Sequence, residues 1–266
     1  MSNDASPLSS VSTIRARNRV LHILQLFEEK AVLSVEEIAQ EVGTSTSSAY
    51  RDVQELCQAG FLAPVVGAGY VLGPAFVQFD RLVRQSDPLI RVAAPRMRSL
   101  LDETTQRAVT VLSRRYRDRV MCVHQEVGHA PHPLTVYERG VAMPMFSGAT
   151  SKVILAHQPD RALQSIYLDN EETIRRTLKC ESWKGFRDQL EEIRKAGVAV
   201  THSEMAEGRI GIAAPVFASK QVIAGLSLVL HERDYGGDDF RDAVVAAARE
   251  ITASLSHEDT WIVRGS

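Results

Sequence analysis

Residues 43–61, "GTSTSSAYRDVQELCQAGF", place five hydroxyl side chains in a row in front of an amphipathic segment. Thr44 or Ser45 is expected to cap a helix there, because a hydroxyl oxygen accepts a hydrogen bond from a free N–H group of the first turn. The apolar residues recur on one helix face and are expected to point inward: Ala49, Val53, Leu56 and Cys57. At about 100° per residue, the outer face then carries the polar residues Ser47, Tyr50, Arg51 and Gln54.

The neighbouring segments extend this pattern on both sides. "ARNRVLHILQLFEEK" (16–30) has its apolar residues on one helix face, and "LSVEEIAQEVG" (33–43) offers Ser34 and Glu37 as a reciprocal capping box. "FLAPVVGAGYVLG" (61–73) places two short apolar runs around glycines, which is typical of a two-stranded hairpin. The order helix, helix-turn-helix, hairpin predicts a winged helix-turn-helix.

This arrangement indicates DNA binding through the helix that begins near Ser45. Hydroxyls and backbone N–H groups at a helix start suit phosphate oxygens, and the same end of a recognition helix reaches base edges in the major groove. Helix capping alone is the alternative, but one or two hydroxyls would suffice for it. The expected DNA contacts are Arg17, Arg19, Ser45, Thr46, Ser47, Ser48, Tyr50, Arg51 and Gln54.

Composition alone would not suggest a nucleic-acid ligand. The net charge is −2, and residues 1–90 hold seven Lys/Arg against ten Asp/Glu, so positive charge is placed locally by residues 15–19 and Arg51. Three well-separated cysteines indicate neither a disulfide framework nor a zinc site and favour the cytoplasm. No apolar run approaches the ~18 residues of a membrane span. The first residues lack the apolar core of a signal peptide.

The remaining chain predicts a linker and a second domain. Residues 74–88 have the pattern of a linker helix, and residues 89–258 mix helices with hairpin-like pairs of strands. The winged helix-turn-helix is expected over 13–73, with flexible tails at 1–12 and 259–266. The expected fold class is therefore α+β, and the second domain is expected to contain a largely antiparallel sheet.

Three phrases in the second domain resemble the IclR family of bacterial transcription regulators, and the resemblance covers the chain from about residue 15 onward. They are "VAMPMFSGATSKVILA" (141–156), "EEIRKAGVAVTHSEMAEGRIGIAAPVF" (191–217) and "VIAGLSLVL" (222–230). The resemblance implies a winged helix-turn-helix, a linker helix and a GAF-like effector-binding domain with a mixed or antiparallel sheet. It also implies a homodimer or homotetramer that binds double-stranded operator DNA and a small organic acid effector.

The effector pocket implied by the resemblance falls on residues 148–151, on 209–211 and on Ser227. Side-chain chemistry adds apolar walls, backbone N–H groups in "SGATS" for an anion, and Arg209 as the partner of a carboxylate. The expected contacts are Met143, Met145, Phe146, Gly148, Ala149, Thr150, Ser151, His202, Arg209, Gly211 and Ser227. The alternatives are a surface pair of Arg209 with a glutamate (Glu204 or Glu207), core packing of the methionines, and a solvated loop at His202.

The chain departs from the family pattern at three of its pocket positions. Ser151 stands where the family has glycine, Phe146 where it has histidine, and Val229 where it has a second hydroxyl. These changes make the pocket bulkier and more aromatic. They favour an aromatic or other larger carboxylic acid from a catabolic pathway over an acid of two or three carbons.

Neither a cofactor nor a metal ion is expected. His124, His129 and His132 lie close in sequence, but their spacing matches no helix-face pair of metal ligands. An enzyme is the first rival interpretation, with Ser151 and Lys152 as nucleophile and base, although no common catalytic or nucleotide-binding motif is present. A constitutive DNA-binding dimer without an effector is the second.

Overall fold

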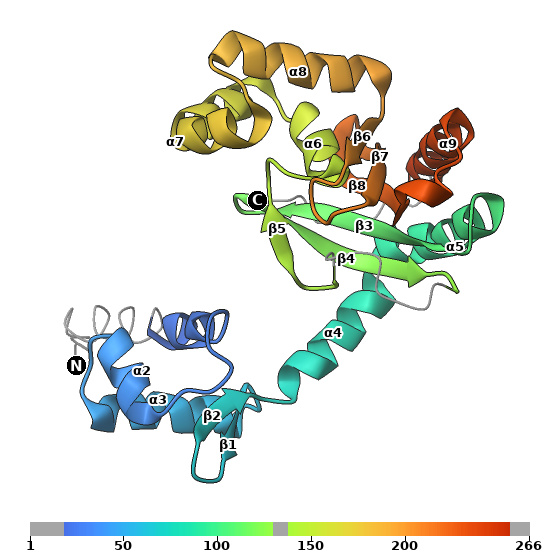
Figure 1. The fold of residues 1–266 in the computed structure, drawn as a ribbon. Helices are drawn as coiled ribbons and strands as arrows, with labels where there is room; N and C mark the ends of the chain where they lie inside the picture. The colour runs from blue at the N-terminus through green and yellow to red at the C-terminus, as the bar shows by residue number, and fades with distance from the viewer. Residues whose placement is uncertain (1–18, 130–137, 256–266) are drawn as a thin grey trace, which may run out of the picture. The chain divides into compact units, whose positions relative to one another are not determined.

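The structure is a computed structural model that describes residues 19–129 and 138–255. The chain forms two compact units, which divide between Gln85 and Ser86 (Figure 1). No helix in the described ranges is both long enough and apolar enough to cross a membrane.

The N-terminal unit combines helices with one hairpin. Its first helix covers residues 19–26. The further elements are α2 (Val35–Glu41), α3 (Thr46–Gln58), β1 (Leu62–Val65), β2 (Gly69–Leu72) and α4 (Ala75–Ser86). The apolar faces of the first three helices and the hairpin share one core, which contains Ile23, Phe27, Leu33, Ile38, Ala49, Val53, Leu56 and Leu62. This arrangement confirms the predicted winged helix-turn-helix.

Local chemistry explains how this unit is held together. The predicted capping box is present: the Glu37 N–H donates to Ser34 Oγ at 3.2 Å, and the Ser34 N–H donates to Glu37 Oε2 at 2.9 Å. The hairpin also has a third partner that the sequence pattern did not predict, because Leu33 pairs with Tyr70 of β2. A Cβ on Gly69 would lie 2.4 Å from the Leu33 carbonyl oxygen, so this close approach requires glycine.

The C-terminal unit is built on one six-stranded sheet. Its strands are β3 (Ala108–Tyr116), β4 (Arg119–Val127), β5 (Ala142–Pro144), β6 (Ala199–His202), β7 (Arg209–Ala218) and β8 (Gln221–His231). Its helices are α5 (Pro88–Glu103), α6 (Ala149–Ala156), α7 (Asp160–Leu178), α8 (Trp183–Ala196), the short 3₁₀ helix η1 (Glu232–Asp234) and α9 (Asp238–Leu255). The strand order is β5-β4-β3-β8-β7-β6, and every neighbouring pair is antiparallel. The predicted α+β class is confirmed.

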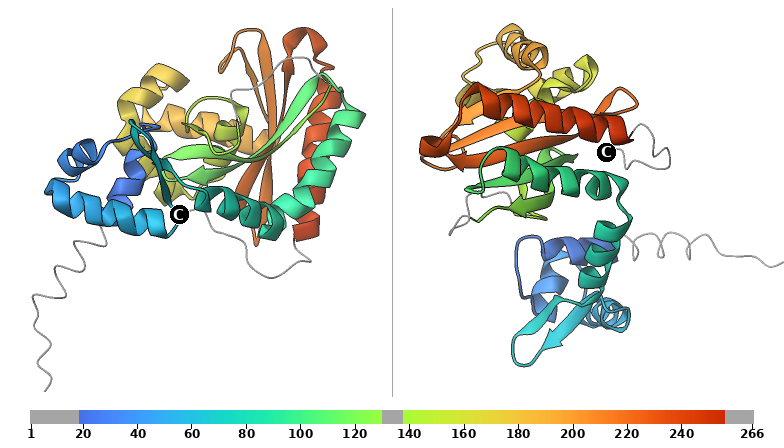
Figure 2. Two further views of the ribbon diagram at one scale, coloured as in Figure 1. Left: turned by 90° about the horizontal axis from the view of Figure 1, so that it is seen from below. Right: turned by 90° about the vertical axis from the view of Figure 1, so that its right-hand side faces the viewer.

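Helices cover both faces of this sheet (Figures 1 and 2). α5 and α9 pack against each other and against one face, where they share an apolar core with β3, β7 and β8. α6 packs on the opposite face against β7 and β8, and α8 packs against α6. We call this second side the α6 face of the sheet.

Strand alternation decides which side chains reach the α6 face. The core beneath α5 and α9 takes the even-numbered residues of β7 and β8, among them Ile210, Ile212, Leu226, Leu228 and Leu230. The odd-numbered residues therefore point to the α6 face, among them Arg209, Gly211, Ser227 and Val229. A Cβ on Gly211 would lie 3.6 Å from the Cβ of Ala149 in α6, which agrees with this orientation.

Candidate functional site

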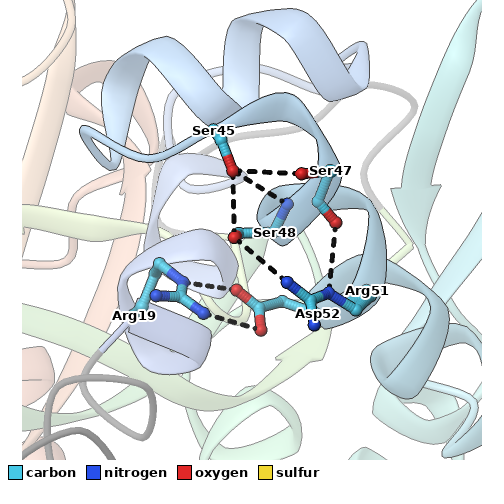
Figure 3. A network of polar contacts seen from close by, with 6 residues as sticks. All are labelled: Arg19, Ser45, Ser47, Ser48, Arg51 and Asp52. Atoms are coloured by element: carbon cyan, nitrogen blue, oxygen red, sulfur yellow. Dashed lines mark hydrogen bonds and ion pairs between the residues drawn. The ribbon is translucent and has the colours of Figure 1, made fainter.

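The start of α3 carries a network of hydroxyl groups (Figure 3). Ser45 is the N-cap, and its Oγ accepts a hydrogen bond from the Ser48 N–H at 3.3 Å. The same Oγ lies 3.2 Å from Ser47 Oγ and 3.0 Å from Ser48 Oγ. Arg51 reaches back over this turn and donates to the Ser47 carbonyl and to Ser48 Oγ, both at 3.4 Å. The network holds the first turn and the arginine in one arrangement.

Exposure divides the predicted contacts on α3 into two groups. The exposed residues are Ser45, Thr46, Ser47, Tyr50 and Arg51, whereas Ser48 and Gln54 are half-buried. Tyr50 is 50% exposed, so α3 presents an aromatic ring beside a cation. The structure thus places the exposed members of the predicted set together on the outer side of α3, with Ser48 turned toward Ser45 and Arg51.

Arg19 is engaged within the N-terminal unit. Its Nε and Nη2 donate to the two carboxylate oxygens of Asp52 in α3, the second bond at 3.0 Å (Figure 3). Asp52 is only 7% exposed, and its hydrogen bond raises the pKa of Arg19. Arg19 therefore ties the first helix to α3 and does not stand free at the surface. Asp52 was not predicted, because 33 positions separate the partners. Arg17 lies outside the described residues.

A cleft of about 760 Å³ lies between the start of α3 and the β1–β2 hairpin. Its lining includes Thr46, Ser47 and Tyr50 from α3 and Val65 from the hairpin. The tip of the hairpin is apolar, and Val66 there is fully exposed. The hairpin tip thus offers no cation to a polyanion.

The start of α6 is occupied by a side chain of the same chain. Gly148 is the N-cap at φ +82°, and its N–H donates to Glu204 Oε2 at 3.0 Å. Glu204 also forms an ion pair with Lys152. Ser151 is fully buried, and its Oγ donates to the Pro144 carbonyl at 2.9 Å. The anion site expected at this helix start is therefore filled by Glu204, and Ser151 is bound to backbone.

The three residues expected as apolar walls do not lie together. Met143 packs against an apolar cluster on the α6 face that contains Val109, Val111, Cys122 and Val229. Met145 and Phe146 are 3% and 5% exposed and belong to the core that α6 shares with α7 and α8. They line a separate cavity of about 460 Å³ beside the β3–β4 turn. The chain leaves the sheet after Pro144, where β5 ends, which separates Met143 from the other two.

His202 lies on the opposite face from the predicted pocket. Its cross-strand partner is Ile210, which points into the core beneath α5 and α9. Its Nδ1 lies 3.3 Å from Glu232 Oε1. The neighbouring Thr201 pairs with Gly211 and is the β6 residue that points to the α6 face. His202 therefore does not share a face with Arg209, Gly211 and Ser227, because a shift of one position in a strand reverses the face.

Arg209 does point to the α6 face, at the start of β7. Its Nη1 is buried and makes no hydrogen bond. Glu204, one of its expected surface partners, pairs with Lys152. Across the strand pair, the pKa of His231 is lowered by partial burial first and by the charge of Arg209 second. A buried N–H without an acceptor is costly, and no acceptor for this nitrogen is found among the described residues.

The other expected effector contacts lie where α6 meets the sheet. Ala149 and Thr150 are buried in the first turn of α6. Ser227 is 1% exposed, and its Oγ donates to the Val111 carbonyl at 3.4 Å. Gly211 keeps space beside Thr201 of β6 and Ala149 of α6, because a Cβ there would lie 3.3 Å from Thr201 Oγ1 and 3.6 Å from the Ala149 Cβ. These residues shape the base of the α6 face.

Two further polar side chains on the α6 face were not predicted. Gln125 of β4 pairs with Val111, and Ser113 of β3 pairs with Cys122, and both partners belong to the apolar cluster of that face. Gln125 Oε1 and Ser113 Oγ are buried and have no hydrogen-bond partner. The β3–β4 pair shifts register between Leu112 and Ser113. Such a bulge breaks the regular alternation, so the sequence pattern could not assign these residues to a face.

The histidine-rich segment forms no metal site within the described ranges. His124 Nε2 lies 3.0 Å from Glu126 Oε1, and His129 is exposed. His132 lies outside the described residues. Among the residues that the structure covers, no three His, Cys, Asp or Glu side chains gather as a metal would require.

Comparison with known proteins identifies both units. The family model of the bacterial transcriptional regulator IclR C-terminal domain matches residues 82–257, and a helix-turn-helix domain model matches residues 19–71. The chain belongs to the IclR family of bacterial transcriptional regulators. Its N-terminal unit is the DNA-binding helix-turn-helix domain of an IclR regulator, and its C-terminal unit is the effector domain.

Curated relatives align with most of this IclR-family chain. The HTH-type transcriptional regulator KipR of Bacillus subtilis is 26% identical over 241 residues, which cover 86% of this chain and 94% of that protein. The HTH-type transcriptional regulator KdgR of Dickeya chrysanthemi is 29% identical over 248 residues, which cover 91% and 80% of the two chains. These relatives are transcriptional regulators and not enzymes, and the same holds for this chain. In agreement, Ser151 and Lys152 do not bond to each other but to Pro144 and Glu204.

Solved structures share the fold. One is an IclR homolog from Microbacterium hydrocarbonoxydans complexed with 4-hydroxybenzoate, with a TM-score of 0.73, 19% identity and coverage of 91% of this chain and 99% of that chain. Another is HmgR of Pseudomonas aeruginosa, with a TM-score of 0.70, 22% identity and coverage of 90% and 98%.

Proposed function

We propose that a carboxylic acid binds the α6 face of the effector domain and controls how tightly α3 binds operator DNA. The observation that carries the effector part is the buried Nη1 of Arg209, which has no hydrogen-bond partner. A guanidinium group binds a carboxylate through short charge-assisted hydrogen bonds. The neighbouring apolar cluster, which includes Val109 and Val229, suits the hydrocarbon part of such an acid.

An aromatic acid is the class that we favour. One fold neighbour is complexed with 4-hydroxybenzoate, which shows that this architecture accommodates a benzoate in that protein. Val229 lies on the α6 face of this chain, at a position where the family pattern has a hydroxyl side chain. The valine makes this surface more apolar than a hydroxyl residue would. Phe146 gives no support, because it is buried in the core with α7 and α8.

Contact with DNA is assigned to the exposed outer side of α3. We assign backbone phosphate contacts to the hydroxyls of Ser45, Thr46 and Ser47, and base contacts to Tyr50 and Arg51, with Gln54 one turn further along. Arg19 acts through Asp52, because both of its bonds go to that carboxylate. It positions α3 rather than serving as a main phosphate contact.

A homo-oligomer completes the proposed DNA complex. α4 has no buried residue, and its Val77, Phe79 and Val83 are 75%, 47% and 47% exposed. A second copy of this chain would cover such apolar side chains. A dimer presents two α3 helices to successive major grooves, which lie about 34 Å apart on a near-palindromic operator. Sedimentation analysis of Phe79→Glu tests this, and an unchanged dimer would remove α4 from the interface.

The effector assignment is tested by isothermal titration calorimetry with benzoate and 4-hydroxybenzoate. Arg209→Met is expected to weaken binding of both acids by about 10- to 100-fold, because it removes a charge-assisted hydrogen bond and leaves the apolar cluster. Arg176→Met, an exposed arginine on α7, is the matched control and is expected to bind as the unmodified chain does. Equal affinity in all three proteins would contradict the assignment.

A further inference from the structure

The α6 face holds more unpartnered polar chemistry than one arginine. Gln125 Oε1, Ser113 Oγ and Arg209 Nη1 are all buried without a hydrogen-bond partner. Strand pairing places all three side chains on the side of the sheet that α6 covers. Buried polar atoms in folded proteins are nearly always hydrogen-bonded, so three exceptions on one face call for a common explanation.

Arg209 and Gln125 cannot bond to each other across the sheet. Arg209 is on β7 and Gln125 is on β4, and β8 and β3 lie between them. Three strand spacings amount to about 14 Å. The two side chains are also displaced along the strands. Gln125 pairs with Val111, and Val111 pairs with Ser227. Ser227 pairs with Ala213, which lies about 13 Å along β7 from Arg209. A molecule lying over β8 and β3 would contact Arg209 at one end and Gln125 at the other.

The surface between these ends is apolar. It contains Val109, Val111, Cys122 and Val229, with Met205 packed against them. Burial raises the pKa of the Cys122 thiol to about 11, so the thiol stays neutral and adds to the apolar surface. A ring or a short hydrocarbon chain fits this middle section, and a charged group does not.

The hydrogen-bonding atoms of Arg209 and Gln125, at the two ends of this surface, then determine which groups a ligand needs. A guanidinium nitrogen only donates, so the end near Arg209 requires an acceptor such as a carboxylate. The atom of Gln125 that lacks a partner is its amide oxygen, which only accepts, so a ligand satisfies it by bringing a hydrogen-bond donor. The Ser113 hydroxyl can do either and sets no further requirement.

We propose that the effector is an acid with a second, hydrogen-bond-donating substituent, such as a hydroxyl or amino group, and that Gln125 selects it. This inference rests on the proposed binding of a carboxylate at Arg209 and adds the chemistry of the opposite end of the ligand. Gln125 is a specificity-determining residue: it rejects an acid of the same shape that lacks the donor, because its own oxygen would remain buried without a partner.

The test compares matched pairs of ligands by isothermal titration calorimetry of the full chain. The pairs are 4-hydroxybenzoate with 4-methylbenzoate and 3-hydroxybenzoate with 3-methylbenzoate, since a methyl group has nearly the size of a hydroxyl but cannot donate. In the unmodified protein, at least one hydroxy acid is expected to bind about tenfold or more tightly than its methyl analogue. No preference for the hydroxyl in either pair would overturn the proposal.

Variants of Gln125 test whether this residue causes the preference for the hydroxy acid over its methyl analogue. Gln125→Met keeps the side-chain length and removes the acceptor, so the affinity ratio within the pair is expected to fall to about one. Gln125→Glu keeps an acceptor oxygen and is expected to retain the preference even if both acids bind more weakly. Gln221→Met, at an exposed glutamine of β8, is the control and should leave the ratio unchanged. A ratio that persists in Gln125→Met would overturn the proposal.

The same titrations separate this inference from the proposed function. Arg209→Met is expected to weaken the hydroxy and methyl acids by the same factor, so the ratio survives while both affinities fall. If Arg209→Met changes neither affinity but Gln125→Met abolishes the ratio, the carboxylate site fails and the role of Gln125 stands. If Arg209→Met weakens binding of both acids and Gln125→Met leaves the affinity ratio unchanged, the carboxylate site stands and the role of Gln125 fails. Absence of binding by all four acids would overturn both.

Discussion

Two helices in this chain begin with small and hydroxyl residues, and the chain uses their first turns in different ways. At α3, Ser45 caps the first turn, and Thr46, Ser47 and Arg51 remain exposed beside it. At α6, the first turn is buried, and Glu204 accepts the N–H bond that an external anion would otherwise take. Both helix starts predict anion binding from sequence, but only that of α3 faces solvent.

The difference shows that a helix start is an anion site only when its surroundings leave it open. Free N–H groups and the helix dipole attract negative charge at any N-terminus. At α6 the internal carboxylate of Glu204 and the nearby Lys152 satisfy that attraction within the fold. The proposed effector is therefore assigned to Arg209 and the sheet surface, and the proposed DNA phosphates to α3.

The largest expected effect is a loss of DNA affinity in the Arg51→Ala variant. Loss of an arginine contact to a base costs about 1–3 kcal/mol, so affinity for operator DNA is expected to fall by about 5- to 150-fold. The measurement is fluorescence anisotropy on a duplex selected by the unmodified protein from a random library, at fixed salt. Oligomeric state and acid binding should not change. Arg176→Ala serves as the control, and unchanged DNA affinity of Arg51→Ala would refute the assignment to α3.

The second prediction concerns the support beneath that surface. Asp52→Asn removes the carboxylate that holds Arg19, and a broken, largely buried ion pair of this kind is expected to cost about 2 kcal/mol. Hydrogen–deuterium exchange of the amides of α3 should accelerate accordingly. Glu191→Gln breaks the exposed pair with Lys195 and should leave exchange in α8 unchanged. Unaltered protection of α3 in Asp52→Asn would show that the pair does not position this helix.

The third prediction removes the internal anion of α6. In Glu204→Ala the Gly148 N–H and Lys152 lose their partner, so the helix start becomes an open anion site. Inorganic phosphate is expected to raise the melting temperature of the variant by a few degrees and to leave the unmodified protein unchanged, through linkage of binding to stability. An equal response of the two proteins would mean that Glu204 is not what closes this site.

The smallest expected effect is a change in the titration of His231. Its pKa lies below the usual value because of partial burial, the charge of Arg209 and the charge of Arg233, with Asp234 acting in the opposite direction. A carboxylate bound to Arg209 offsets that positive charge, so the pKa of His231 should rise on binding. Binding then takes up protons near this pKa, and acid affinity should increase as pH falls through it. NMR titration with and without 4-hydroxybenzoate measures the shift, and a shift to lower pKa would be the wrong sign.

Much of the DNA-binding domain could be predicted because its signals are local. Ser34 and Glu37 are three positions apart, Ser45 stands directly before its helix, and helical spacing alone assigns Ala49 to the core. The same local reasoning could not find the bond between Arg19 and Asp52, which tertiary packing brings together.

The effector domain was harder to predict because strand register sets its site. The sequence indicates the antiparallel hairpins but not the bulge beside Ser113, so the orientation of Gln125 could not be derived. His202 and its neighbour Thr201 point to opposite faces, and the sequence pattern did not show which of them faces α6. Arg209 was identified through the family resemblance, and its unpartnered nitrogen is visible only in the folded chain.

The central claim is that an acid bound at Arg209 controls DNA binding by α3, and it is tested by measuring the DNA affinity of the full chain with and without saturating 4-hydroxybenzoate. The acid is expected to change the affinity of the unmodified protein by about 5- to 150-fold, the usual range of allosteric coupling. Arg209→Met is expected to bind the same duplex and to show no response at that acid concentration. An acid response of equal size in Arg209→Met would contradict the account.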